Sequence, residues 1–93
     1  MQTRSTIVTG TPTNLNQLLL NAGYSAADIA SMPAVVFQNK GSSVIYFSEG
    51  TTAQSIENSF DLYGKEWGDA IPPYNEVWLR SHTFDTPIVF KAG

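Results

Sequence analysis

The chain carries four short runs of apolar residues, each bounded by turn-forming residues. β-Branched and aromatic residues dominate these runs, which is typical of β-strands. Their apolar side chains fall on both parities, whereas the side chains of a strand with one solvent-exposed face alternate between apolar and polar. We therefore expect sheets whose second face meets something other than the chain's own core, which favours assembly over chemistry. The runs cover residues 34–39, 43–48, 76–81 and 86–91.

The segments between these runs predict how the strands connect. Residues 39–42 join the first two runs, and their Asn, Gly and Ser residues predict a hairpin over 34–48. In such a turn we expect a positive φ at Gly41 or at Asn39. The last two runs predict a further pair of strands. Between the two pairs the pattern predicts strands at 52–57 and 59–63 and a proline-containing loop at 67–74.

The N-terminal third predicts a strand at residues 3–9 and two short helices. Thr13 or Asn14 can cap the first helix, and Gly23 stands where a C-terminal glycine ends one. Ser25 and Asp28 form a variant of the capping box, which predicts a second helix that ends at the Met-Pro pair 32–33. The first helix would present one apolar stripe, formed by Leu15, Leu18, Leu19 and Ala22.

These elements predict a mainly β protein, a small antiparallel β-sandwich or jelly-roll-like domain with one or two short N-terminal helices. Residues 1–93 would form a single domain, in which 1–33 is an N-terminal strand and helical arm and 34–93 is the sandwich. A chain of 93 residues buries only about 60–65% of its unfolded surface, so a lone monomer would have marginal stability.

Composition narrows the classes of function. The net charge of −3 argues against a protein that binds a nucleic-acid backbone. The chain has no cysteine, and only 14% of its residues are charged, so Ser, Thr and Asn dominate the polar surface. The N-terminus shows no apolar signal-peptide region, and no apolar run is long enough for a membrane span. We expect neither a nucleic-acid nor a membrane partner.

Few residues are candidates for chemistry. Ser81, His82 and Asp85 are the residue types of a hydrolase triad, but neighbours in one strand point to opposite faces, and His82 is better explained as a turn residue. Paired carboxylates for glycoside cleavage would draw on the acids of the middle segment. A calcium site would use Asp61 and Asp69 with carbonyl groups, but the chain lacks the ligand-spacing motif. We expect no catalytic, cofactor-binding or metal-binding residues, and no enzyme. These acids are Asp61, Glu66, Asp69 and Glu76.

Four aromatic residues could form a platform for a sugar ring, because aromatic faces pack on the apolar side of pyranoses. These residues are Tyr63, Trp67, Tyr74 and Trp78. The simpler interpretation places Trp78 in the core of its strand, and Trp67 and Tyr74 in the core or at a subunit contact. The leucine stripe would pack on the sheet or, less simply, dock a partner. The candidate interface residues are Leu15, Leu18, Leu19, Trp67, Tyr74 and Trp78.

From Met32 onward, the order of these signals resembles small structural proteins of tailed phages, above all capsid decoration, or cement, proteins. The resemblance covers a strand ending in Asn, a Gly/Ser turn, a Val-x-Tyr strand, a Leu-containing turn segment, a proline-bounded loop and a strand with an aromatic residue before Leu-Arg. Ser48 stands where such proteins often have Gly. The corresponding segments are 35–39, 41–43, 44–46, 60–62, 71–73 and 77–80.

The resemblance implies a non-enzymatic virion protein that binds and stabilises a phage capsid. It implies a homo-oligomer, a trimer above all, with the major capsid protein as its other partner. It places the protein on the capsid surface, and in the host cytoplasm during assembly. The alternative is a carbohydrate- or receptor-binding module of a phage fibre or tail, with a glycan as ligand.

Overall fold

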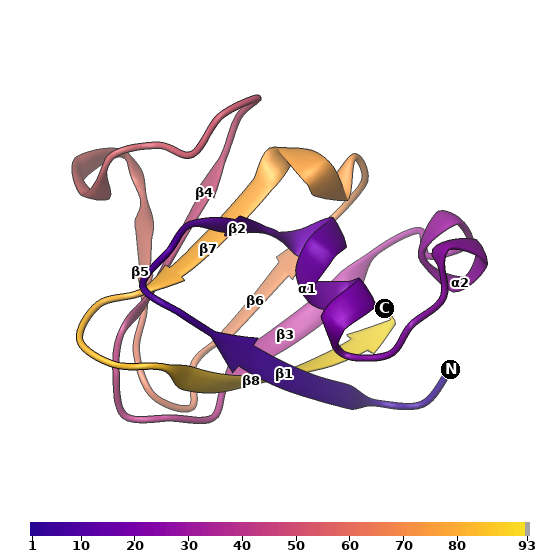
Figure 1. Cartoon of the computed structure of the whole chain (residues 1–93), viewed down its shortest axis with the longest axis horizontal. Coiled ribbons are helices and arrows are strands. Elements are labelled where there is room, and N and C mark those ends of the chain that lie inside the picture. Colours follow the sequence, from indigo (N-terminus) through magenta and orange to yellow (C-terminus); the bar gives the residue numbers. More distant parts are fainter. Residues whose placement is uncertain (93) are drawn as a thin grey trace.

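Eight strands form two four-stranded antiparallel sheets that pack face to face (Figure 1). The structure, a computed structural model, describes residues 1–92. Sheet A has the order β1-β8-β3-β6, and sheet B has the order β2-β7-β4-β5. The strands are β1 (Arg4–Val8), β2 (Thr13–Asn14), β3 (Val35–Asn39), β4 (Ile45–Glu49), β5 (Phe60–Leu62), β6 (Trp67–Ala70), β7 (Val77–Ser81) and β8 (Thr86–Ala92). The helices are α1 (Leu15–Asn21) and α2 (Ala26–Ala30), with the 3-10 turns η1 (Ile56–Asn58) and η2 (Tyr74–Glu76).

The strand order is that of a jelly roll. Counted from the two ends of the chain, β1 pairs with β8, β2 with β7, β3 with β6 and β4 with β5. These four pairs alternate between the two sheets, and two further pairings, β3 with β8 and β4 with β7, complete them. Eight strands arranged in this way form the double-sheet jelly roll. The predicted mainly β, jelly-roll-like sandwich with two short helices is confirmed.

The core lies between the sheets and follows the alternation of each strand. In β3 and β7 every second residue is buried and its neighbours are half-buried. The rings of Phe37 in sheet A and Phe47 in sheet B meet with centroids 5.5 Å apart, which joins the two layers. Burial of these apolar side chains is the main stabilising contribution to the fold. The fully enclosed members include Phe37, Phe90, Leu15, Leu18, Leu19, Met32, Ile45, Leu79, Ile88, Val8 and Val35.

Both helices begin at the residues that the sequence predicts, and α1 also ends where expected, whereas α2 ends at Ala30, before the Met-Pro pair. The Asn14 side chain accepts a hydrogen bond of 2.8 Å from the Gln17 backbone N–H and so caps α1. Gly23 has a φ of 106° and ends α1 in a Schellman motif, in which the Tyr24 N–H reaches back to the Leu19 carbonyl. At the start of α2, Ser25 and Asp28 complete a reciprocal capping box.

Helix α1 packs beside β1, β2, β7 and η2, and it covers the side of the sandwich where β1 and β2 are the edge strands (Figure 1). Its leucine stripe faces the core, as the packing interpretation of the sequence has it. The division into an N-terminal arm and a separate sandwich is wrong, because β1 and β2 each pair with a C-terminal strand as part of a sheet.

Several expected connections differ from the structure. Residues 34–48 form no hairpin, because β3 lies in sheet A and β4 in sheet B, so that 40–44 crosses between layers. For the same reason β7 and β8 do not pair with each other. Residues 52–57 form a loop that leads into η1, and the expected loop at 67–74 contains strand β6. The two errors of pairing share one cause: tight-turn residues can join two strands of one sheet or two layers, and local sequence does not distinguish the two.

Gly41 is needed for a reason other than the predicted one. The glycines with positive φ in residues 1–92 are Gly23 and Gly50, and Asn39 has no positive φ either. A Cβ atom at Gly41 would lie 2.6 Å from Thr86 Cγ2 and 3.0 Å from Pro87 Cδ. Contacts this short are excluded by van der Waals repulsion, so the β3–β4 connection approaches β8 closely only with glycine at this position.

Candidate functional site: the open side of the sandwich

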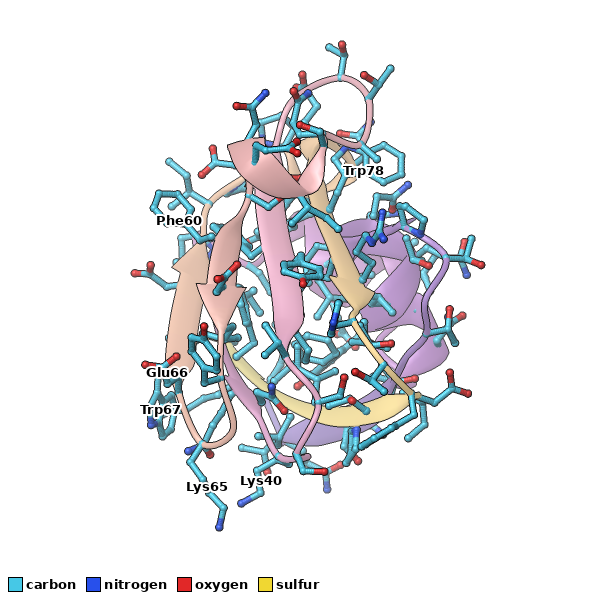
Figure 2. All side chains as sticks on the ribbon, turned by 90° about the vertical axis from the view of Figure 1, so that its left-hand side faces the viewer. Lys40, Phe60, Lys65, Glu66, Trp67 and Trp78 are labelled. Atoms are coloured by element: carbon cyan, nitrogen blue, oxygen red, sulfur yellow. The ribbon has the colours of Figure 1, made fainter. Side chains whose placement is uncertain are left out.

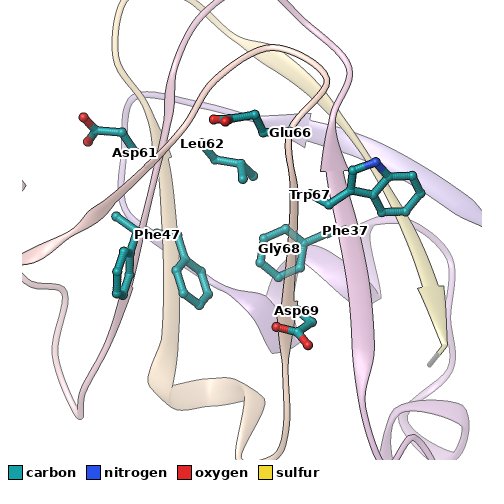
Figure 3. A pocket seen from close by; sticks show the side chains of 9 residues that line it. Phe37, Phe47, Asp61, Leu62, Glu66, Trp67, Gly68 and Asp69 are labelled. Atoms are coloured by element: carbon teal, nitrogen blue, oxygen red, sulfur yellow. The ribbon is translucent and has the colours of Figure 1, made fainter.

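The side opposite α1 is open and holds a groove of about 520 Å³ between β5 and β6 (Figure 3). β5 is the edge strand of sheet B and β6 is the edge strand of sheet A, so the groove runs between the free edges of the two layers. Its lining combines aromatic and aliphatic side chains with three carboxylates. The lining residues are Phe37, Phe47, Phe60, Asp61, Leu62, Glu66, Trp67, Gly68 and Asp69.

The apolar floor of the groove comes from residues that face inward on both sheets. Phe47 stands opposite Phe60 in the β4–β5 pair, and the centroids of these two rings are 6.1 Å apart. Phe37 stands opposite Gly68 in the β3–β6 pair, and a Cβ atom at Gly68 would lie 2.5 Å from Phe37 Cε2. Glycine at this position therefore allows the Phe37 ring to lie directly against β6. Phe60, at the edge, is 74% exposed.

Three carboxylates lie around this floor, of which Asp61 and Asp69 stand at outward-facing strand positions, opposite Tyr46 and Val36. Glu66 and Asp69 lie toward opposite ends of the groove on the side of Gly68, and Asp61 lies on the side of β5 (Figure 3). One Glu66 oxygen accepts a 2.7 Å hydrogen bond from the Tyr63 N–H, which orders the turn between β5 and β6. No Lys, Arg or His is among the lining residues. Within residues 1–92, no group of three or more His, Cys, Asp or Glu side chains is placed to hold a metal ion.

The side chain of Asn39 connects two segments beside the groove by hydrogen bonds. Its side chain is fully buried, and its amide N–H groups donate 2.8 Å hydrogen bonds to the carbonyls of Ser43 and Leu62. Its side-chain oxygen accepts a 2.9 Å hydrogen bond from the Gly41 N–H. One amide thus ties the β3–β4 crossing to the end of β5, just before the chain crosses to β6. Sequence reasoning placed Asn39 in a turn but assigned it no such role.

Exposed apolar side chains are concentrated in the segment of the chain that carries β5 and β6. Of the nine large hydrophobic residues that are exposed within residues 1–92, five lie between residues 56 and 71, around β5 and β6. Exposed apolar side chains that adjoin one another commonly mark binding surfaces, and two of the five, Phe60 and Trp67, line the groove. These five are Ile56, Phe60, Tyr63, Trp67 and Ile71. Phe60 and Gly68 were missed as site residues, because the sequence does not reveal that β5 and β6 face each other across two layers.

The outer face of sheet A is a second apolar surface. Across this face Ser5 stands opposite Val89, Val89 opposite Gln38, and Gln38 opposite Trp67. Trp67 is 62% exposed, and its indole points away from the groove (Figure 3). In residues 1–92 no helix packs against this face to cover it. Its apolar members are Ile7, Val36, Trp67, Pro87 and Val89.

The outer face of sheet B, in contrast, is covered by the chain's own side chains. The Arg80 guanidinium lies 5.8 Å from the centre of the Tyr46 ring, and the Tyr46 hydroxyl is 2.8 Å from His82 Nδ1. Trp78 also faces outward and is half-buried, so the expected core position is wrong. Its Nε1–H donates a 2.9 Å hydrogen bond to the Gly50 carbonyl. The two sheets therefore differ in how much of their outer faces remains uncovered.

The structure does not assemble a Ser–His–Asp triad. Ser81 is buried on the inner face of β7, and its Oγ has no hydrogen-bond partner. The ring of His82 contacts Tyr46 instead, and Asp85 is an exposed residue of the β7–β8 loop. Neighbouring positions of the strand end thus face opposite ways, as the alternation of side chains predicts.

Four of the six candidate interface residues offer no surface. Leu15, Leu18 and Leu19 are core residues of α1, and Tyr74 is 4% exposed with its hydroxyl donating to the Met32 carbonyl over 2.9 Å. The sequence offers these residues as interface candidates beside the packing interpretation, because an apolar stripe or a loop aromatic has the same pattern in either role. The four aromatics also form no single platform, because Tyr74 is buried and Trp78 lies on sheet B.

Two tyrosines, Tyr24 and Tyr74, have raised pKa values. Burial raises the pKa of Tyr74 above its ordinary value. Burial also raises the pKa of Tyr24, although the positive charge of Arg4, whose guanidinium lies 5.5 Å from the centre of the Tyr24 ring, partly opposes this effect. Both hydroxyls donate to backbone carbonyls, so both tyrosines act in the fold and not in the groove.

No protein-family model, curated protein or solved structure matches this chain. In residues 1–92, neither helix has the length and apolar character that crossing a bilayer requires.

Proposed function

We propose that this protein is a non-enzymatic structural protein of a tailed-phage particle, a decoration or cement protein that binds the capsid shell. It would assemble as a homotrimer in the host cytoplasm and act on the capsid surface. The observation that supports this most is the contrast between the sheets: sheet B covers its outer face with its own side chains, whereas sheet A leaves an apolar face uncovered.

The proposed mechanism is burial of apolar surface between subunits. Interfaces combine an apolar centre with a polar rim, and they gain stability by removing apolar area from water. The outer face of sheet A has this composition, because Ile7, Val89 and Trp67 lie among Ser5, Gln38 and Lys91. A jelly roll also occurs in lectins and other proteins, so the fold by itself does not carry the proposal.

Molar mass in solution tests the oligomer. We expect light scattering to give three times the chain mass of 10.1 kDa. The double variant Ile7→Ser/Val89→Thr should shift the mass toward the monomer, because it places polar groups on the proposed contact. Leu20→Gln, on the exposed side of α1, is the matched control and should leave the trimer intact. A parent protein that stays monomeric at micromolar concentration would contradict the proposal.

Co-sedimentation tests the capsid partner. Empty capsids assembled from the major capsid protein of the same genome should carry the protein into the pellet at a fixed stoichiometry. Capsids that pellet without it would rule out the decoration role.

The second candidate is a carbohydrate- or receptor-binding module of a phage fibre or tail, and the exposed indole of Trp67 favours it. An exposed tryptophan can stack on a sugar ring, and Tyr63, which is also exposed, lies in the turn that leads from β5 to Trp67. A glycan array separates the two candidates: specific binding that is lost in Trp67→Ala, together with a monomeric mass, would favour the binding module.

A further inference from the structure

The groove between β5 and β6 lies at two free strand edges. β5 pairs with β4 on one side and β6 pairs with β3 on one side, and in residues 1–92 neither has a second partner strand. The two strands lie together along the left-hand side of Figure 2, away from α1. Free edges present unpaired backbone N–H and C=O groups, and an extended segment of another protein can pair with them as an added strand.

The charge of the groove selects the chemistry of that segment. Three carboxylates and no cationic side chain surround an apolar floor. The nearby cations Lys40 and Lys65 extend downward in Figure 2, away from the body of the molecule. A Lys or Arg side chain matches both features, since its aliphatic stem packs on apolar surface while its charged head stays at the polar rim. Aromatic rings also attract such a head.

The same charges oppose a second copy of the chain. If two β6 strands paired edge to edge, Glu66 and Asp69 of one copy would approach those of the other. Like charges placed opposite each other destabilise a strand pair. The net charge of −3 adds to this repulsion. The groove therefore favours a cationic partner over self-association.

We propose that this groove binds an extended segment of a partner protein, in which an Arg or Lys stands two residues from a large apolar residue, so that both side chains face the groove. The segment adds to the free edge of β6. Its apolar residue packs on Phe47 and Phe60, and its cationic head lies between Glu66 and Asp69. This inference rests on the proposed function in that the partner would be the capsid protein, and the groove would be the contact with the shell.

Fluorescence anisotropy with a defined peptide tests the site. The probe is a fluorescein-labelled peptide that alternates Thr with Arg and Phe, and the control peptide has Glu in place of Arg. We expect the basic peptide to bind at least about tenfold more tightly than the acidic one. Its affinity should fall as salt is raised, because exposed charges are screened.

Matched variants locate the site. Glu66→Gln/Asp69→Asn should weaken binding of the basic peptide roughly tenfold, and the amide oxygen that replaces the Glu66 carboxylate can still accept the hydrogen bond from the Tyr63 N–H. Phe60→Ser should weaken binding by removing the most exposed ring of the floor. Asp85→Asn removes an acid of the β7–β8 loop and should leave the affinity unchanged. Circular dichroism verifies that each variant is folded.

Three results would overturn the proposal. The first is equal affinity for the basic and acidic peptides, and the second is unchanged affinity in both groove variants. The third is a parent oligomer that Phe60→Ser dissociates, which would show the groove to be a contact between copies. Failure of the capsid function is a separate result. A protein that binds the basic peptide but not capsids would refute the decoration role. If both groove variants still bind capsids, the groove is not the contact with the shell.

Discussion

At the residue scale, Gly41 shows how the absence of a side chain allows two elements to approach each other closely. The expected turn would need glycine for its backbone conformation, but the structure needs it for space beside Thr86 and Pro87. The two explanations differ in what can relieve a substitution. A conformational requirement cannot be relieved by a change elsewhere, whereas a steric one can be relieved by trimming the neighbour.

We therefore predict that Gly41→Ala lowers the free energy of unfolding by about 1–3 kcal/mol, the usual effect of overpacking. Thr86→Ser removes the Cγ2 atom that the new methyl group would meet, and it keeps the hydroxyl that donates to Phe84. In a double-mutant cycle measured by urea denaturation, Thr86→Ser should recover part of the loss. Strict additivity of the two substitutions would contradict a steric origin.

At the element scale, local signals predicted what lies within a few residues and failed where layers meet. The caps of α1 and α2 depend on Asn14, Gly23, Ser25 and Asp28, each of which acts within one helical turn. The pairing of β3 depends on β6 and β8, whose paired residues lie about 30 to 60 positions away in the chain. No local pattern specifies this choice.

Strand β6 was missed for a related reason. Its sequence Trp-Gly-Asp-Ala has low intrinsic β-propensity and precedes two prolines, so composition indicates a loop. Pairing with β3 makes it a strand, since tertiary context overrides propensity. The groove could not be predicted for the same reason. Its aromatic and acidic residues are present in the sequence, but local sequence does not show that they come together between two sheets.

The prediction at this scale concerns Asn39, which ties the β3–β4 crossing to the end of β5. Asn39→Ala would leave the carbonyls of Ser43 and Leu62 and the Gly41 N–H without their partner in a buried site. Unsatisfied buried groups cost about 1–3 kcal/mol each, and partial solvation reduces the sum, so we expect a loss of roughly 2–4 kcal/mol in urea denaturation. Gln38→Ala, whose amide donates one hydrogen bond at the surface, should cost less than about 1 kcal/mol. Equal losses in the two variants would refute the role given to Asn39.

At the scale of the whole molecule, the roles of aromatic residues depended on position and not on type. Tyr74 and Trp67 both came from the segment read as a loop, yet Tyr74 closes the core beside Met32 and Trp67 lies on an outer face. The sequence reading anticipated that one face of the sandwich would remain apolar. Which sheet carried that face was decided by Arg80 and His82, whose packing on Tyr46 covers sheet B.

The buried tyrosines also govern how the molecule responds to alkali. The pKa values of Tyr24 and Tyr74 are raised in the folded chain, chiefly by burial, above the ordinary value of about 10 that holds when the chain is unfolded. Their contribution to stability is therefore fully present below about pH 10. As the pH rises above that value, the unfolded chain loses its phenolic protons first, and stability falls.

We expect the free energy of unfolding to decline above about pH 10 by up to about 1.4 kcal/mol per pH unit for each buried tyrosine. Tyr74→Phe should lower stability at about pH 7 by about 1 kcal/mol, because it removes the hydrogen bond to Met32, and it should make the alkaline decline shallower. Tyr24→Phe/Tyr74→Phe should make the decline shallower still. Urea denaturation from about pH 7 to about pH 11 measures both effects. If the double variant and the parent declined in parallel, the alkaline loss of stability would arise elsewhere than from these two phenols.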